Sequence, residues 1–310
     1  PARAAAERLF DALACADADV LFGWALGAAA MSLDASRATD SFLDPRIHQA
    51  RRQPGQIAAA AALRSWLEGT QIVGSHADND PRVQDPYSLR CMPQVMGAAS
   101  DCLGYVKGCV ATELGAVTDN PLVFTDPTGD PIVSGGNFHG MPLAIPLDAM
   151  AIALTHLAGI SERRIFWMTA ALDSESHLKP YLAAGQPGLS SGLMIAQYTA
   201  AACCNEMITL CTPASVSNVG TSAGMEDYNS FGPRAGAKAR RALNLARSVV
   251  AIELLTAAAG LDVHRPLKSG GRVETLHAAI RAIVRPLTED RSPAPDIAAI
   301  ERLMLTPVGF

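Results

Sequence analysis

The chain has 310 residues with a net charge of −5, and 49% of them are hydrophobic while only 5% are aromatic. This apolar content excludes an intrinsically disordered chain, and the mild acidity excludes a protein that coats nucleic acid with clustered Lys and Arg. Much of the apolar content is alanine, which favours helices over strands, so an all-α fold is predicted. No run of about eighteen apolar residues occurs, so no membrane span and no membrane partner are expected.

Helical patterns follow one another along the chain. The first runs from Ala4 to about Met31, and the second from Ile57 to Leu67. The pattern from Pro93 to Leu114 repeats apolar residues at helical spacing and is followed by Gly115, a typical helix stop. Further helices are predicted over segments 142–170, 193–210, 235–259, 274–284 and 295–305.

One small β-hairpin is predicted near residues 121–134, because two short apolar stretches, 122–124 and 132–133, flank the turn-rich segment 126–130. No internal repeat is visible, so residues 1–310 are expected to form a single helical domain. This domain is predicted to be a long-helix bundle, and its weakly charged helices favour association between subunits.

Cysteine and histidine spacing argues against a metal site. The histidines form no HExxH motif, and no CxxC motif is present. We interpret the cysteines as small buried hydrophobes in a reducing compartment, so a cytoplasmic location is expected. There are seven: Cys15, Cys91, Cys102, Cys109, Cys203, Cys204 and Cys211.

The segment from Gln84 to Cys91 is the first candidate site. Asp85 suits a helix N-cap and Pro86 the first helical position, so a short helix is predicted here. Tyr87 and Arg90 then lie three residues apart on one face, with Gln84 just outside the helix. Guanidinium groups bind carboxylates through two parallel hydrogen bonds, which favours a carboxylate site. The alternative is a capped helix start with a surface arginine.

Two further segments could carry chemistry. In the segment 134–140, paired glycines before Asn137 and Phe138 let the backbone approach a ligand closely, although they could equally form a turn that leaves the hairpin. In the segment 222–230, Glu226 and Asp227 are adjacent carboxylates. At a helix start such carboxylates usually complement the helix dipole, whereas in a cleft Glu226 could bind a cation or exchange protons.

Taken together, these motifs closely resemble the histidine ammonia-lyases within the aromatic amino-acid ammonia-lyase family. The resemblance runs in order from Asp44 to Leu305. Its main blocks are QDPYSLRCMPQ (84–94), TDNPLVF (118–124), SGGNFH (134–139), GLSSGLMIAQYTAAA (188–202) and TSAGMED (221–227). The blocks AIELL (251–255) and VRPLTEDRSPAPDI (284–297) favour the histidine branch.

The resemblance implies a bundle of the aromatic amino-acid lyase type and the conversion of L-histidine to trans-urocanate and ammonia. These enzymes use 4-methylideneimidazole-5-one (MIO), an electrophilic prosthetic group formed from an internal Ala-Ser-Gly. By resemblance, Tyr87 would be the general base, and Glu226 would contact the imidazole or exchange its proton. The aromatic lyases for phenylalanine and tyrosine usually carry Gln at the latter place, so Glu226 favours histidine as the substrate.

The same resemblance implies four substrate-binding residues. Arg90 would bind the substrate carboxylate and Gln84 would assist it, whereas Phe138 would pack near the prosthetic group with Asn137 adjoining. The family forms homotetramers whose sites combine residues from several subunits, so a homotetramer is expected. No nucleic-acid partner is expected.

Two departures from the family pattern shape the prediction. Met92, Met225 and Tyr228 stand where the pattern has Gln, Gln and His, and no Ala-Ser-Gly occurs anywhere in the chain. We therefore expect the carboxy-terminal part of a longer histidine ammonia-lyase, inactive alone, whose amino-terminal electrophile-forming part is absent from the chain. It would assemble as a homotetramer or with that missing amino-terminal fragment. The alternatives are a lyase or aminomutase for tyrosine or phenylalanine, and a non-catalytic helical assembly protein derived from the enzyme.

Overall fold

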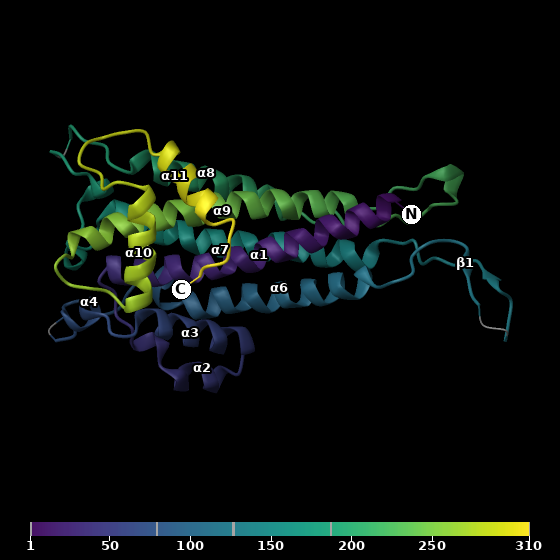
Figure 1. The fold of residues 1–310 in the computed structure, drawn as a ribbon, viewed down its shortest axis with the longest axis horizontal. Helices are drawn as coiled ribbons and strands as arrows, with labels where there is room; N and C mark the ends of the chain where they lie inside the picture. Colours follow the sequence, from purple (N-terminus) through teal and green to yellow (C-terminus); the bar gives the residue numbers. More distant parts are fainter. Residues whose placement is uncertain (1, 79, 126–127, 187, 310) are drawn as a thin grey trace.

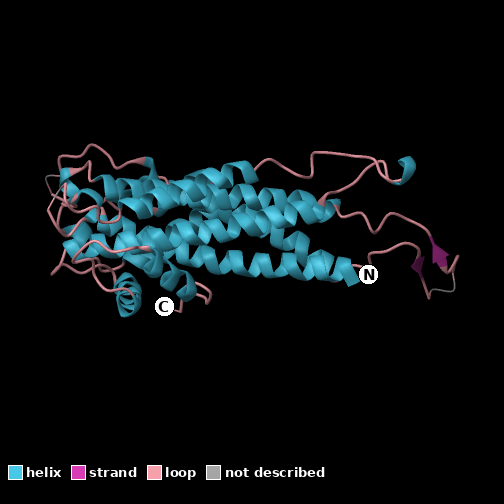
Figure 2. Cartoon of the chain, turned by 90° about the horizontal axis from the view of Figure 1, so that it is seen from above, coloured by secondary structure: helices cyan, strands magenta, loops and turns pink. Residues whose placement is uncertain are grey.

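The computed structural model describes residues 2–78, 80–125, 128–186 and 188–309, with side chains from residue 11 onward. Long helices packed along one axis dominate this part of the chain (Figure 1). The described residues contain one sheet, a two-stranded antiparallel hairpin (Figure 2). The prediction of an all-α bundle with one small hairpin is confirmed.

Five long helices form the bundle. Buried ion pairs join Asp148 to Lys238 and Arg164 to Glu253, so α7 and α9 run in the same direction. α1 runs with them, whereas α6 and α8 run in the opposite direction (Figure 1). Their bounds are α1 Ala2–Ala35, α6 Met92–Leu114, α7 Met141–Ala170, α8 Met194–Leu210 and α9 Gly232–Val263.

Shorter helices cover one end and one side of this bundle. The 14-residue α3 packs against α6, and α11 packs against α9. The α-helices among them are α2 Pro45–Arg51, α3 Pro54–Leu67, α4 Gln71–Gly74, α5 Tyr87–Arg90, α10 Gly271–Ile283 and α11 Ala294–Leu303. Single-turn 3-10 helices span Ser41–Leu43, Ser174–Ser176, Pro180–Leu182 and Ser222–Gly224.

The crossing of α3 and α6 is unusually close, and two glycines make it possible. A Cβ atom on Gly97 would lie 2.3 Å from the backbone nitrogen of Gln56, and one on Gly55 would lie 2.2 Å from the carbonyl oxygen of Gly97. Since real Cβ atoms do not approach backbone so closely, only glycine allows this packing. The crossing places α3 directly against the first turns of α6, just after α5.

The hairpin joins α6 to α7 and extends beyond the end of the bundle (Figure 2). In it β1 (Leu122–Val123) pairs with β2 (Ile132–Val133), with Leu122 opposite Val133. The predicted turn includes residues 126–127, which lie outside the described residues. The side chains of the hairpin are mostly exposed, so this extension contributes little to the core of the chain.

The apolar faces of the long helices meet in one core, to which α9 contributes a nearly continuous buried stretch. By length and composition alone, three of the described helices could cross a membrane: Asp11–Ala35, Met141–Ala170 and Gly232–Val263. The expectation of no membrane span rested on uninterrupted apolar runs, and it stays a prediction. In the bundle these helices pack against one another, and a buried ion pair joins the latter two.

The cysteine interpretation is only partly correct. Cys15 is buried, whereas the other six thiols are half-buried, and all seven are free. Burial, aided by the neighbouring Asp11 and Asp19 carboxylates, raises the pKa of Cys15 to about 11. Burial likewise raises the pKa of Cys204 to about 12. These two thiols therefore stay protonated at neutral pH.

Candidate active site

The one-turn helix α5 presents Tyr87 and Arg90 side by side. The Arg90 guanidinium lies 4.6 Å from the centre of the Tyr87 ring, a cation–π contact. Its Nε donates to the carbonyl oxygen of Asp85 at 3.0 Å, so both terminal nitrogens can receive a carboxylate. Tyr87 is 70% exposed and Gln84 is exposed beside it, so this face of α5 is open to a ligand.

The predicted N-cap at Asp85 is wrong. Pro86 occupies the N-cap position of α5, and no side chain caps the helix. The buried Asp85 carboxylate instead accepts two hydrogen bonds from Thr39, one from its backbone N–H at 2.9 Å and one from its hydroxyl at 2.8 Å. Thr39 lies four residues after the end of α1 at Ala35. The hydrogen bonds of Asp85 therefore connect the start of α5 to the end of α1.

Arg82 strengthens the same attachment. Its guanidinium contacts the carboxylates of Asp80 at 2.6 Å and Asp173 at 3.1 Å, and it donates to the carbonyl oxygen of Arg37. The hydrogen bonds from Arg82 lower the pKa of Asp80 to about 2, so this carboxylate stays charged. The loop that leads into α5 is thus held to Asp173 by an ion pair and to the carbonyl group of Arg37 by a hydrogen bond.

Asn137 and Phe138 lie in the loop between the hairpin and α7, where both are exposed. The loop is anchored on one side by the side-chain oxygen of Asn120, which accepts from the Gly135 N–H at 2.7 Å. On the other side His139 Nε2 donates to the carbonyl oxygen of Tyr228 at 2.9 Å. These bonds connect the Phe138 loop to the segment that carries Glu226.

Glu226 lies in a short turn before α9 rather than in its first turn. Its backbone pairs with Thr221, and its carboxylate accepts from the Thr221 hydroxyl at 2.6 Å. Hydrogen bonds from Thr221 and Ser222 lower the pKa of Glu226, so this exposed carboxylate stays ionised. Since α9 begins at Gly232 with no acidic residue in its first turn, the helix-dipole interpretation of Glu226 is wrong.

The six predicted site residues form two groups at opposite ends of the bundle. Arg164 of α7 contacts the carbonyl oxygen of Ser88 in α5, whereas Phe138 lies three residues before the start of α7 at Met141. At a rise of 1.5 Å per residue, the 23 steps from Met141 to Arg164 span roughly 35 Å. Gln84, Tyr87 and Arg90 are therefore together at one end, and Asn137, Phe138 and Glu226 at the other. One copy of the chain does not bring the two groups into one site.

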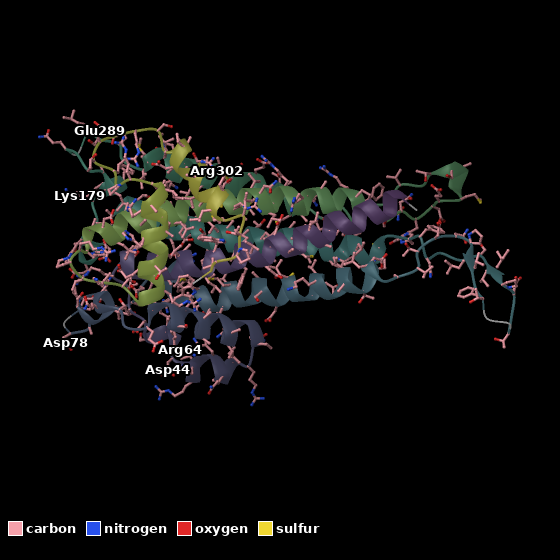
Figure 3. All side chains as sticks on the ribbon, viewed as in Figure 1. Asp44, Arg64, Asp78, Lys179, Glu289 and Arg302 are labelled. Carbon is pink, nitrogen blue, oxygen red and sulfur yellow. The ribbon has the colours of Figure 1, made fainter. Side chains whose placement is uncertain are left out.

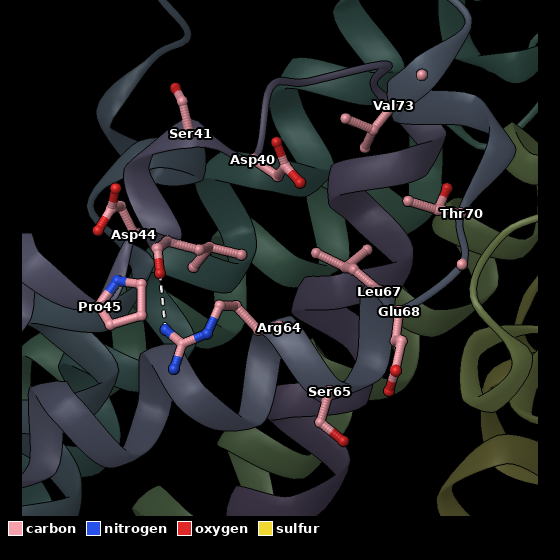
Figure 4. A pocket seen from close by; sticks show the side chains of 13 residues that line it. Asp40, Ser41, Asp44, Pro45, Arg64, Ser65, Leu67, Glu68, Thr70 and Val73 are labelled. Atoms are coloured by element: carbon pink, nitrogen blue, oxygen red, sulfur yellow. Dashed lines mark hydrogen bonds between the residues drawn. The ribbon is translucent and has the colours of Figure 1, made fainter.

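An open cavity of about 810 Å³ lies elsewhere, between the α2–α3 region and the start of α4 (Figure 4). Arg64 donates to the carbonyl oxygen of Leu43 at 2.7 Å on its wall. Figure 3 shows Arg64 and Asp44 on this side of the bundle, far from the hairpin. None of the predicted site residues lines the cavity. In the part of the chain that the structure describes, no cluster of three His, Cys, Asp or Glu could hold a metal ion.

Comparison with known proteins decides the family. The family model for aromatic amino acid lyases matches residues 10–282. The chain belongs to the aromatic amino acid lyase family. It is 50% identical over 278 residues to a histidine ammonia-lyase of Anaeromyxobacter dehalogenans (strain 2CP-C), a match that covers 89% of this chain and 54% of that protein.

Solved structures of aromatic amino acid lyases share the fold. The histidine ammonia-lyase of Trypanosoma cruzi matches with a TM-score of 0.88 at 39% identity, over 96% of this chain and 55% of that one. A tyrosine aminomutase from Streptomyces globisporus matches with a TM-score of 0.88 at 31% identity, over 96% and 59%. The chain thus spans little more than half the length of these family members.

Sequence reasoning missed Arg164 and Glu253, which pair beneath α5 in this lyase bundle. A signal was present, because Glu253 is a single carboxylate in an otherwise apolar stretch of α9. Such charges are seldom buried unless they are paired. The pattern indicated that Glu253 needs a partner, but the partner lies 89 residues away in the chain.

Proposed function

We propose that this chain provides the substrate-binding part of a histidine ammonia-lyase, in sites completed by other chains. The observation that carries the proposal is the pairing of Arg90 with Tyr87 on the open face of α5, in a chain 50% identical to a histidine ammonia-lyase. Arg90 would bind the carboxylate of the amino acid through its two terminal nitrogens. Gln84, exposed beside it, would donate to the same group.

Tyr87 is proposed as the base of the elimination. In that step a proton leaves the β-carbon of histidine, the bond from the α-carbon to nitrogen breaks, and ammonia departs as the double bond of urocanate forms. With Arg90 holding the carboxylate, the Tyr87 oxygen would be kept beside the same substrate molecule. A general base must lie within hydrogen-bonding distance of the proton that it removes.

Glu226 is proposed to bind the imidazole. Its hydrogen bonds from Thr221 and Ser222 lower its pKa and keep it charged, which suits an acceptor for an imidazole N–H better than a proton donor. The side chain of phenylalanine has no hydrogen-bond donor, so this charge favours histidine over phenylalanine. Tyrosine carries a phenol O–H in place of the ring N–H, so the comparison with tyrosine is left to the experiment.

The separation of roughly 35 Å between the two groups supports sites shared between copies. The end of one chain that carries Tyr87 would meet the end of another that carries Phe138 and Glu226. The exposed apolar side chains of the hairpin and of Phe138, which is 61% exposed, would then become buried. A homotetramer, as expected for the family, is proposed as the assembly.

The residues of this chain cannot form the prosthetic group of the family. The 310 residues contain no Ala-Ser-Gly from which MIO could form. The proposed roles of Tyr87, Arg90 and Glu226 therefore concern substrate binding and proton position only. We further propose that the 310 residues alone do not release ammonia from histidine.

Two measurements test the proposal. The purified 310-residue protein is incubated with L-histidine and the absorbance of urocanate is followed; turnover would contradict the proposed inactivity. A protein that joins this chain to a family segment containing Ala-Ser-Gly is then offered histidine, tyrosine and phenylalanine separately. Preferred turnover of histidine is expected. Loss of this turnover in Arg90→Met would support the role of Arg90 in carboxylate binding, provided that the control Arg241→Met, at an exposed arginine of α9, keeps it. Preference for tyrosine or phenylalanine, or no turnover of any of the three, would refute it.

A further inference from the structure

A fully buried ion pair lies in the bundle directly beneath α5. Arg164 of α7 and Glu253 of α9 are both 0% exposed. Arg164 Nε and Nη2 donate to the two carboxylate oxygens of Glu253 at 2.5 and 2.9 Å. The same oxygens accept from the hydroxyls of Ser32 at 2.7 Å and Ser161 at 2.5 Å. The carboxylate therefore accepts four hydrogen bonds, and three helices meet at it.

The remaining side of the guanidinium faces the candidate active site. Arg164 Nη1 lies 3.4 Å from the carbonyl oxygen of Ser88, the residue next to Tyr87 in α5. A one-turn helix leaves carbonyl groups without intrahelical donors, and Arg164 supplies a donor to one of them. Leu89, 0% exposed, packs on the core side of α5, while Tyr87 and Arg90 face outward.

Stability alone does not account for a charged pair at this place. The desolvation of two buried charges offsets most of their attraction, and apolar pairs of similar size are often as stable or more so. What the pair adds is geometry, because the planar guanidinium directs hydrogen bonds along set directions. Bound to Glu253 on one side, Arg164 has little freedom to move relative to Ser88 on the other.

We propose that Arg164 and Glu253 are positioning residues that hold α5, so that Tyr87 and Arg90 keep a fixed orientation toward the substrate. Glu253 acts through Arg164, and Arg164 acts through the carbonyl group of Ser88. The proposal rests on the proposed function only for the roles of Tyr87 and Arg90. The coupling between the ion pair and α5 is a property of this chain and is measurable without turnover.

The test removes the pair and follows α5 directly. In Arg164→Met/Glu253→Leu both charges are replaced by apolar side chains of similar size, and Arg164→Lys keeps the charge but offers one nitrogen instead of three. The control is Lys238→Met/Asp148→Leu, which removes the other buried ion pair between α7 and α9. Asp148 lies 16 residues from Arg164 in α7, roughly 24 Å away.

Two readouts are used on the 310-residue protein. Amide hydrogen exchange is measured for the peptide that covers residues 84–92. Fluorine NMR is recorded after 3-fluorotyrosine labelling, and the Tyr87 signal is assigned among the five tyrosines with Tyr87→Phe. In both Arg164 variants we expect the α5 amides to exchange about 10-fold faster and the Tyr87 signal to move, while α9 amides stay within about twofold.

The control variant is expected to leave α5 exchange and the Tyr87 signal unchanged. If a folded Arg164→Met/Glu253→Leu protein matches the wild type in both readouts, the proposal is wrong. Should that protein not fold, Arg164→Lys decides in the same way. An equal change in the control variant also overturns the proposal, since it would show general loosening of the bundle. A finding that the complete protein is no lyase leaves these readouts unaffected, so the two failures are distinguishable.

Discussion

Replacing Gly97 by alanine should destabilise the protein through a clash between two helices. The new Cβ would lie 2.3 Å from the backbone nitrogen of Gln56 and 2.5 Å from its Cα. Ordinary contacts of this kind begin at 3.4 Å, so α3 and α6 would have to separate by about 1 Å. Backbone atoms cannot rotate away as side chains can, and the neighbouring Ala60 and Leu63 are fully buried.

The magnitude follows from two opposing effects. Overpacking of a rigid core costs about 1–3 kcal/mol, and the backbone contact places Gly97→Ala near the upper end. Alanine gains about 1 kcal/mol over glycine in a helix interior. We therefore expect a net loss of about 2 kcal/mol of unfolding free energy. Gly104 and Gly108 lie in the same helix, and a methyl group added at either would meet nothing within 4 Å, so their alanine variants should gain up to about 1 kcal/mol.

Urea denaturation, followed by circular dichroism at one protein concentration, measures these differences as shifts in the midpoint at constant slope. The three variants have the same chemical change in one helix, so helix propensity is matched. If Gly97→Ala proves as stable as Gly104→Ala, the close crossing of α3 and α6 is not present as described, and the reasoning fails.

Three further predictions concern charged groups. Burial raises the pKa of Asp34 to about 7. The protonated Asp34 side chain therefore contributes its full share of the unfolding free energy below pH 4, and this share is lost as the pH rises through 7. Asp34→Asn should flatten that decline in urea midpoints measured from pH 4 to 8. Glu253→Gln leaves the Arg164 charge buried without its carboxylate, and it should lower the unfolding free energy by about 3–5 kcal/mol in the same assay. This loss should exceed that of Arg164→Met/Glu253→Leu, and a larger loss in the double variant would contradict the prediction. Glu226→Gln should leave the urea midpoint unchanged, because the side chain is exposed. In the protein that joins this chain to a family segment containing Ala-Ser-Gly, the same variant should raise KM for histidine about 10-fold, and an unchanged KM would remove Glu226 from the proposed binding site.

The sequence was sufficient for the long helices and the hairpin, because their patterns are local, whereas the short helices α2 and α4 were not predicted. Apolar residues at helical spacing and the stop at Gly115 predicted α6, which ends at Leu114. The turn residues between two short apolar stretches predicted the hairpin. The face shared by Tyr87 and Arg90 also follows from helical spacing, and the structure places their side chains in contact.

Non-local partners set the limit of that reasoning. Asp85 was assigned to a local cap, yet its carboxylate binds Thr39, 46 residues away in the chain. No local pattern distinguishes these two fates of an aspartate before a proline. The division of the site residues between two ends depends on the direction of whole helices and on the length of α7. Matching motifs along a chain gives no information about the distance in space between the two groups of site residues.

The division of the site residues has a consequence for mixtures of defective chains. If each site draws α5 from one copy and the Glu226 turn from another, then a chain damaged only at Arg90 still carries a sound Glu226 end, and a chain damaged only at Glu226 still carries a sound α5. Where two such chains assemble together, the two sound ends can meet, while the two damaged ends meet elsewhere. Two inactive alleles would then complement each other within one oligomer, and neither would do so alone.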